Sequence, residues 1–141
     1  MCLKNGGFIS AGGILAVCLA VSLLTAGSAK GQAQWPGTAV SEDGTPIAYE
    51  VFGKGEPALV FVHGWSCDAR YWRAQVPVFS KDHRVVTLDL AGHGHSGADR
   101  TIHTMEDYGA DVKVVTEAVS ADKVILIGHS MGGEVIIDAA S

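Results

Sequence analysis

The sequence is poor in cysteine, and this shortage limits how the fold can be stabilised. It has three cysteines in 141 residues, and Cys2 and Cys18 both lie within the first twenty positions. Cys67 is alone in the remainder, so no internal disulfide can form there, even in an oxidising compartment. The fold must therefore rely on its hydrophobic core, and we expect Cys67 to be a buried, unreactive thiol.

Basic residues are also scarce, and they do not cluster. Ten lysines and arginines stand against fifteen acidic residues, which gives a formal net charge of −5. Nucleic-acid binding depends on clustered positive charge that neutralises phosphates, so the composition predicts no nucleic-acid partner. The sequence also lacks internal repeats and low-complexity blocks, and a chain of this length has room for one domain at most.

The first thirty positions nearly lack charge. Lys4 is the only charged residue before Lys30, and an apolar run at residues 14–24 is followed by small residues at positions 26–29. This pattern is typical of a secretory signal peptide, so we expect residues 1–29 to be a cleaved leader and the protein to be secreted or periplasmic. The alternative is an uncleaved leader that anchors the protein to a membrane and is its only membrane contact.

A linker is expected at residues 30–36, and the domain that follows it, residues 37–141, contains short apolar runs that suit β-strands. Five such runs occur, at residues 38–41, 46–52, 58–62, 84–90 and 124–127. Asp43-Gly44, between the first two runs, is a strong hairpin signal. The domain is therefore predicted to open with an antiparallel hairpin.

Segments of helical spacing alternate with the later strands. They lie at residues 68–79, where Pro77 weakens the pattern, at residues 105–119, and after residue 130. Thr104 and Asp107 resemble the cap of the second helix. This alternation predicts an α/β fold with a mostly parallel sheet and helices on both faces. Chemistry in such sheets gathers at the carboxyl ends of the strands.

The chain is organised around a glycine-flanked serine. Residues 124–127 predict a strand buried on both faces, which leads directly through Gly128-His129-Ser130-Met131-Gly132 into a predicted helix. Strand, sharp turn and helix form the context in which this pattern presents a serine clear of the sheet. The helix N-terminus then offers free N–H groups to an oxyanion beside Ser130. The alternative is a serine that only caps a helix.

Three motifs follow three of the predicted strands: His63-Gly64-Trp65, Asp89-x-x-Gly92-x-Gly94-x-Ser96 and Gly128-x-Ser130-x-Gly132-Gly133. By these motifs and their order the chain, from about Gly37 to Ser141, resembles the α/β-hydrolase family. The resemblance implies that Ser130 is the nucleophile, and that the backbone N–H groups of Met131 and Trp65 form an oxyanion hole. The residues expected to support these motifs are His63, Gly64, Gly128, His129 and Gly132.

The resemblance implies no cofactor and no metal. His93 and His95 lie in the glycine loop of the second motif, which the family uses as a turn, so we expect no metal site there. Asp89 is expected to hold this loop rather than to act as the catalytic acid. His63 is expected to fix its own loop rather than to act as a general base.

The chain departs from the family pattern after Ser130. In this family an acidic residue and then a histidine follow the nucleophile, but only eleven residues follow Ser130, none of them histidine, and Asp138 lies in the predicted helix. We therefore expect the chain to be the N-terminal half of the sheet of a longer enzyme. By itself it would be marginally stable, with a bare edge on its last strand, and would show little or no turnover.

The resemblance implies an exported serine hydrolase that cleaves an ester or related acyl bond of a small molecule through an acyl-enzyme. Serine at this position argues against epoxide hydrolases and haloalkane dehalogenases, which carry aspartate there. Esterases, lipases, lactonases, carbon–carbon bond hydrolases and cofactor-free haloperoxidase-like enzymes all remain. The alternative is a non-catalytic binding protein of the same fold, or the product of a degenerate gene.

Overall fold

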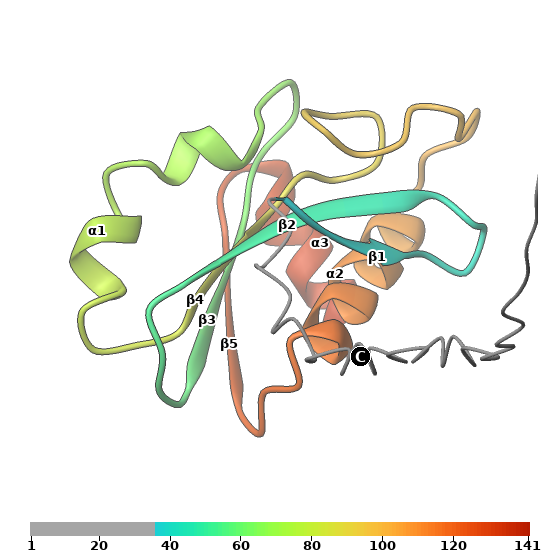
Figure 1. Cartoon of the computed structure of the whole chain (residues 1–141). Coiled ribbons are helices and arrows are strands. Elements are labelled where there is room, and N and C mark those ends of the chain that lie inside the picture. Colours follow the sequence, from blue (N-terminus) through green and yellow to red (C-terminus); the bar gives the residue numbers. More distant parts are fainter. Residues whose placement is uncertain (1–35) are drawn as a thin grey trace, which may run out of the picture. The chain divides into compact units, whose positions relative to one another are not determined.

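The computed structural model describes residues 36–141. The predicted leader, and the predicted linker up to residue 35, lie outside the described residues. Within residues 36–141 the chain forms one five-stranded sheet in the order β1-β2-β4-β3-β5 (Figure 1). The strands are β1 (Gly37–Val40), β2 (Pro46–Phe52), β3 (Ala58–Val62), β4 (Val85–Leu88) and β5 (Val124–Gly128). All five predicted strands are present, and the predicted α/β class is confirmed.

The sheet is mixed, as the sequence predicts. β1 and β2 form an antiparallel hairpin, and Gly44 in its turn adopts a positive φ of 86°, which glycine tolerates without strain. β2 pairs with β4 in antiparallel fashion, whereas β3 lies parallel to both β4 and β5. The carboxyl ends of β3, β4 and β5 therefore meet at one edge of the sheet, and the three motifs follow those ends.

The helical segments differ in how closely they match the prediction. Helix α2 (Met105–Ala118) begins with a capping box, in which Thr104 and Asp107 each bond the other's backbone N–H. Helix α3 (Met131–Ala139) begins directly after Ser130. The helix predicted at residues 68–79 is instead two short pieces, the 3₁₀ helix η1 (Ala69–Trp72) and α1 (Val76–Phe79). Pro77 lies in the first turn of α1, where its missing N–H costs little.

Successive residues of β3 point to opposite faces of the sheet and pack into two cores. Val60 and Val62 join the larger core beneath α2 and α3, while Leu59 and Phe61 join the smaller core with Trp72 of η1. β3 pairs with a strand on each side, and all five of its residues are buried. It is the central strand of the parallel part of the sheet.

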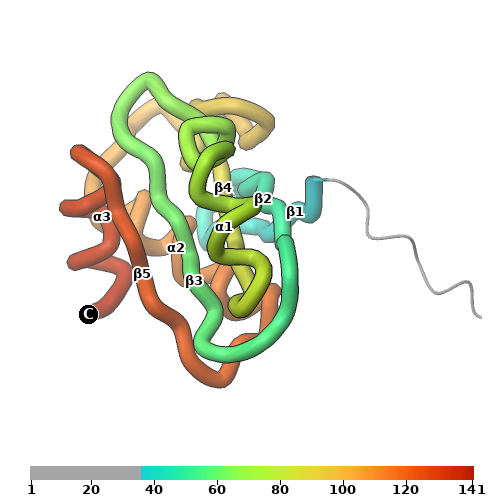
Figure 2. Tube along the Cα trace, turned by 90° about the vertical axis from the view of Figure 1, so that its left-hand side faces the viewer, coloured from blue at the N-terminus to red at the C-terminus, as the bar shows by residue number. Residues whose placement is uncertain are grey.

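β5 is not buried on both faces, and that prediction is wrong. β5 lies at an edge of the sheet and, among the described residues, pairs only with β3 (Figure 2). Val124 and Ile125 are consequently 36% and 47% exposed. An apolar groove of about 700 Å³ runs between this strand, α2 and α3. No helix within residues 36–141 has the length and apolar character needed to cross a bilayer.

Candidate active site

Ser130 lies at the sharp turn between β5 and α3. Its backbone adopts φ 53° and ψ −123°, a left-handed conformation that is strained for any residue other than glycine. The turn is held by two hydrogen bonds, from Gly132 N to His129 O (2.9 Å) and from Gly133 N to Ser130 O (2.8 Å). Ser130 is the N-cap residue of α3, but its side chain makes no capping hydrogen bond.

Two of the flanking glycines allow this turn to pack closely. A Cβ on Gly128 would overlap the carbonyl group of Gly132, and a Cβ on Gly132 would overlap the carbonyl oxygens at the end of β3. His129 N donates to Val62 O at 3.0 Å, which anchors the turn to the same strand end. The glycine pattern predicted from the sequence therefore has a direct steric cause, and it places α3 against β3.

The loop after β3 lies beside Ser130. A Cβ built on Gly64 would be 3.1 Å from Ser130 Cβ and 3.0 Å from His129 O, so the two segments are in contact. Within residues 36–141, neither the Trp65 amide nor the Met131 amide donates a hydrogen bond to another residue. The two amides expected to form the oxyanion hole are thus free donors on the segments that meet at Ser130.

His63 joins the loops after β3 and β4. Its side chain is fully buried, Nδ1 lies 2.8 Å from Gly64 O, and Nε2 lies 3.1 Å from Leu90 N. A carbonyl oxygen only accepts, so Nδ1 carries the proton and Nε2 accepts from the Leu90 amide. Burial lowers the pKa of His63 and favours this neutral form. Both ring nitrogens are occupied, which suits a loop-fixing residue.

Asp89 performs a similar task in the loop after β4. Its nearly buried carboxylate accepts from Ala69 N at 2.7 Å and from His95 N at 2.8 Å, which ties η1 to the glycine loop. Gly94 packs directly against this carboxylate with a positive φ of 50°. His95 Nδ1 also lies 3.2 Å from Asp89 Oδ2. These bonds suit the predicted loop-holding role, and the described residues contain no group of three side chains suited to a metal.

His129 and Cys67 complete the residues considered from the sequence. The ring of His129 stacks on Tyr71 with centroids 4.4 Å apart, and no described histidine bonds to Ser130.

Cys67 is half-buried and free, so the expectation of a buried thiol is wrong. It lies in the exposed turn that follows Trp65, closed by a bond from Cys67 N to Gly64 O (3.2 Å).

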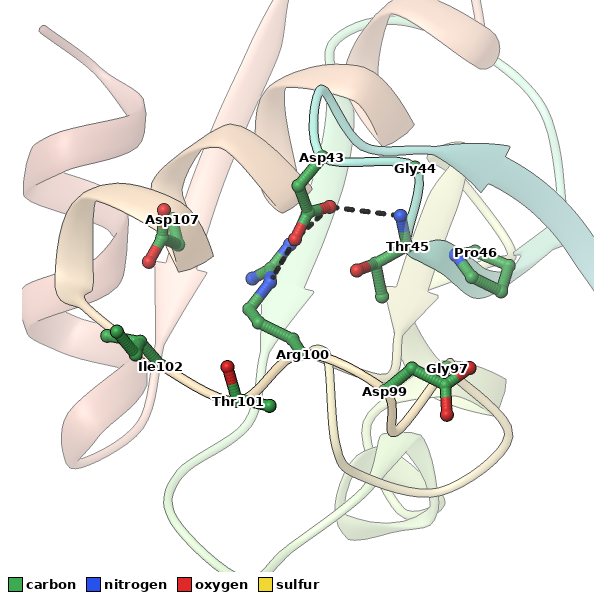
Figure 3. A pocket seen from close by; sticks show the side chains of 10 residues that line it. All are labelled: Asp43, Gly44, Thr45, Pro46, Gly97, Asp99, Arg100, Thr101, Ile102 and Asp107. Carbon is green, nitrogen blue, oxygen red and sulfur yellow. Dashed lines mark hydrogen bonds and ion pairs between the residues drawn. The ribbon is translucent and has the colours of Figure 1, made fainter.

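A buried ion-pair cluster was not foreseen from the sequence. Arg100 pairs with Asp43 of the hairpin turn (Figure 3) and with Asp111 of α2, each at 2.7 Å. Arg100 is 6% exposed and Asp111 is fully buried. Burial opposes the charge of Arg100, but the hydrogen bonds from the two carboxylates raise its pKa above the usual value. The sequence offered one sign of this cluster: the acidic residue Asp111 stands beside Val112, on the buried face of α2.

The cluster fixes the loop that precedes α2. Arg100 lies 57 positions from Asp43 and 11 from Asp111, so it links three separate elements. Asp111 also accepts from Ala91 N at 3.3 Å, which extends the linkage to the loop after β4. A cleft of about 450 Å³ opens beside Arg100, bounded by the hairpin turn, Thr101 and Ile102 (Figure 3).

Comparison with known proteins gives a consistent set of similarities. A family profile described as alpha/beta hydrolase fold matches residues 57–141. The chain is 43% identical over 100 residues to a non-heme chloroperoxidase of Streptomyces lividans, covering 69% of this chain and 36% of that protein. It is 36% identical over 99 residues to a bifunctional esterase/perhydrolase of Acinetobacter calcoaceticus, with the same two coverages.

Solved structures of the same fold superpose on the described residues. An esterase from Thermogutta terrifontis superposes with a TM-score of 0.69 at 29% identity, covering 74% of this chain and 40% of that one. An enol-lactonase from Burkholderia xenovorans gives 0.66 at 30% identity, with coverages of 70% and 39%. The chain thus spans about a third of the length of the curated relatives it matches.

Proposed function

The chain belongs to the α/β-hydrolase fold family, and from this premise we propose that the protein is an exported serine hydrolase that forms an acyl-enzyme on Ser130. The fold alone hosts several reactions, since its structural neighbours include an epoxide hydrolase and a bottromycin epimerase. The observation that carries the proposal is the strained backbone of Ser130, whose side chain makes no capping bond, next to the free amides of Trp65 and Met131. The proposed substrate is a small molecule with an ester or related acyl bond.

The proposed reaction proceeds in two steps. A general base takes the proton of Ser130 as Oγ attacks the carbonyl carbon, and the carbonyl oxygen becomes an oxyanion. The N–H groups of Met131 and Trp65 donate to this oxygen, and the alcohol leaves with a proton. Water then hydrolyses the acyl-enzyme, which releases the acid and restores Ser130. The base and its acidic partner are proposed to come from outside residues 36–141.

A second candidate differs only in what attacks the acyl-enzyme. Several relatives are named non-heme haloperoxidases, and one is named an esterase/perhydrolase. Hydrogen peroxide in place of water would release a peracid and restore the same serine. Peracid formation from an acetate ester and hydrogen peroxide, measured beside acetate formation, distinguishes the two candidates.

The alternative function is a non-catalytic binding protein of this fold, or a degenerate gene product. A binding protein has no chemical need for a serine held at φ 53° or for two amides left without partners beside it. Such strain is typical of a site that performs chemistry, which favours the enzyme.

Fluorophosphonate labelling tests the proposed function. The protein from the complete reading frame, including any codons past Ser141, is treated with the probe and digested, and the modified peptide is identified by mass spectrometry. We expect one labelled serine, Ser130, and no labelling of the Ser130→Ala variant. A folded wild-type protein that does not react, or reacts equally well after the substitution, would contradict the acyl-enzyme mechanism.

A further inference from the structure

We propose that His93 is a positioning residue for the oxyanion hole, because its ring ties the loop after β4 to the loop that carries Trp65. This inference rests on the proposed function of Ser130 and adds a residue that contacts neither the nucleophile nor the two amides. His93 lies in the glycine loop of the second motif, where the sequence suggested only a turn.

Hydrogen bonds define the state of the His93 ring. Nδ1 lies 3.0 Å from Ala91 O, and Nε2 lies 3.3 Å from the backbone nitrogen of Ser66. Ala91 O only accepts, so Nδ1 carries the proton, and Nε2 uses its lone pair to accept from the Ser66 N–H. The geometry therefore requires the neutral, Nδ1-protonated ring. The ring acts as a bridge between two loops that are separate in the sequence.

Ring contacts hold His93 in this orientation. Its centroid lies 5.4 Å from that of Trp65 in an edge-on arrangement, and 5.1 Å from that of His63. Tyr108 of α2 lies on another side, at 6.2 Å, again edge-on. The ring is half-buried, so rotation about its side-chain bonds would disrupt contacts with both loops and with a helix.

The bond to Ser66 acts on Trp65 through the backbone. The Ser66 N–H belongs to the peptide plane that follows Trp65, while Gly64, on the other side, packs against Ser130. Ser66 has a positive φ of 56°, a conformation that costs free energy in serine and persists only when surrounding groups hold it. The His93 bond is such a contact, and losing it would let the Trp65 amide turn away from the developing oxyanion.

Two substitutions separate the hydrogen bonds from the ring contacts. His93→Gln can keep a donor for Ala91 O and an acceptor for the Ser66 N–H without an aromatic ring. His93→Phe keeps an aromatic ring beside Trp65 but loses both bonds. His103→Phe is the matched control, because His103 lies in the same long connection and stacks on Tyr108, and none of its ring contacts is with the loop after β3.

The readout is steady-state hydrolysis of p-nitrophenyl acetate by the protein from the complete reading frame. We expect His93→Phe to lower kcat by roughly tenfold to a hundredfold with KM changed by less than about twofold, since small misplacement of a transition-state donor has effects of this order. We expect His93→Gln to restore kcat to within about threefold of the wild type, and His103→Phe to match the wild type. An unchanged kcat in His93→Phe, or no recovery in His93→Gln, would overturn the inference.

Nitrogen-15 NMR of the histidine rings keeps the test independent of activity. A wild type that neither hydrolyses esters nor reacts with fluorophosphonate counts against the proposed function, and the inference is then decided by the ring and amide signals. We expect His93 to be the neutral Nδ1-protonated tautomer at neutral pH. We also expect the Ser66 and Trp65 amide signals to shift in His93→Phe but not in His103→Phe. A wild-type His93 protonated at Nε2 would overturn the inference, even if His93→Phe failed to fold.

Discussion

Two adjacent glycines of α3 offer a sharp test of how the Ser130 turn is built. A Cβ on Gly132 would lie 2.6 Å from His63 O and closer still to Val62 O, whereas a Cβ on Gly133 would meet nothing within 4 Å. Both residues are in the first turn of the same helix, and neither has a positive φ. Gly132→Ala and Gly133→Ala therefore make the same chemical change in crowded and in open surroundings.

The expected magnitudes follow from two terms. Replacing a helical glycine by alanine stabilises by about 0.5–1 kcal/mol, because the unfolded chain loses conformational freedom, and this gain is common to both variants. Forcing an extra methyl group into a packed site costs about 1–3 kcal/mol, and this cost applies to Gly132 alone. The obstructing atoms are backbone oxygens at the end of buried β3, which cannot rotate away. The free energies of unfolding of the two variants should therefore differ by about 1–3 kcal/mol.

Urea denaturation of the two variants and the wild type, followed by circular dichroism, measures this difference. Gly133→Ala should equal or exceed the wild type in stability, and Gly132→Ala should unfold at lower urea with an unchanged m-value. Fluorophosphonate labelling gives a second readout, because displacing α3 also displaces the Met131 amide. Equal stabilities for the two alanine variants would refute the proposed close approach of α3 to β3.

Three further predictions concern the rest of the chain. Arg100→Ala should lower the free energy of unfolding by about 3–5 kcal/mol, because it leaves the buried carboxylate of Asp111 without its ion-pair partner. Asp43→Asn, at the exposed end of the cluster, should lower it by less than about 1 kcal/mol. Equal losses for the two variants in denaturation experiments would contradict this prediction. Burial lowers the pKa of His63 in the folded state below its usual value of 6.5. As the pH drops below 6.5, His63 is therefore protonated in the unfolded state before it is protonated in the folded state. Stability should fall as the pH drops from 6.5 towards the folded pKa. The fall should be smaller in His63→Asn when unfolding is measured across this range. N-terminal sequencing of the exported protein should begin near residue 30, and a retained leader would favour the anchored alternative.

Local patterns in the sequence predicted most of the elements, because short-range chemistry determines them. β2 and β3 occur at the predicted residues, and α2 begins at the predicted cap. The turn at Ser130 was also predicted, since its glycines and the strand before it are adjacent in the chain. Pro77 correctly predicted that the helix at residues 68–79 would be interrupted or weakened, although the structure has two short helices there rather than one weakened helix.

The features that escaped prediction depend on residues far apart in the sequence. Strand order decides how far an apolar run is buried, and the exposure of Val124 and Ile125 in β5 was not predicted, although the bare edge of this strand was. The Arg100 cluster joins residues 57 positions apart, and the bridge from His93 to Ser66 spans 27. The bridge has no local signature, and the local sign of the cluster is only Asp111 on the buried face of α2, because both features depend on where loops from different strands meet.

The position of β3 in the sheet has a consequence for the timing of synthesis. β3 is buried along its whole length, yet both of its neighbours, β4 and β5, follow it in the chain, and β5 begins only at Val124. Roughly sixty residues must be translated after β3 before its second neighbour exists, which takes about 3–12 s at usual rates of elongation. Throughout that interval an entirely apolar strand has at least one unpaired edge, and we expect the nascent chain to need a holding chaperone until β5 is made.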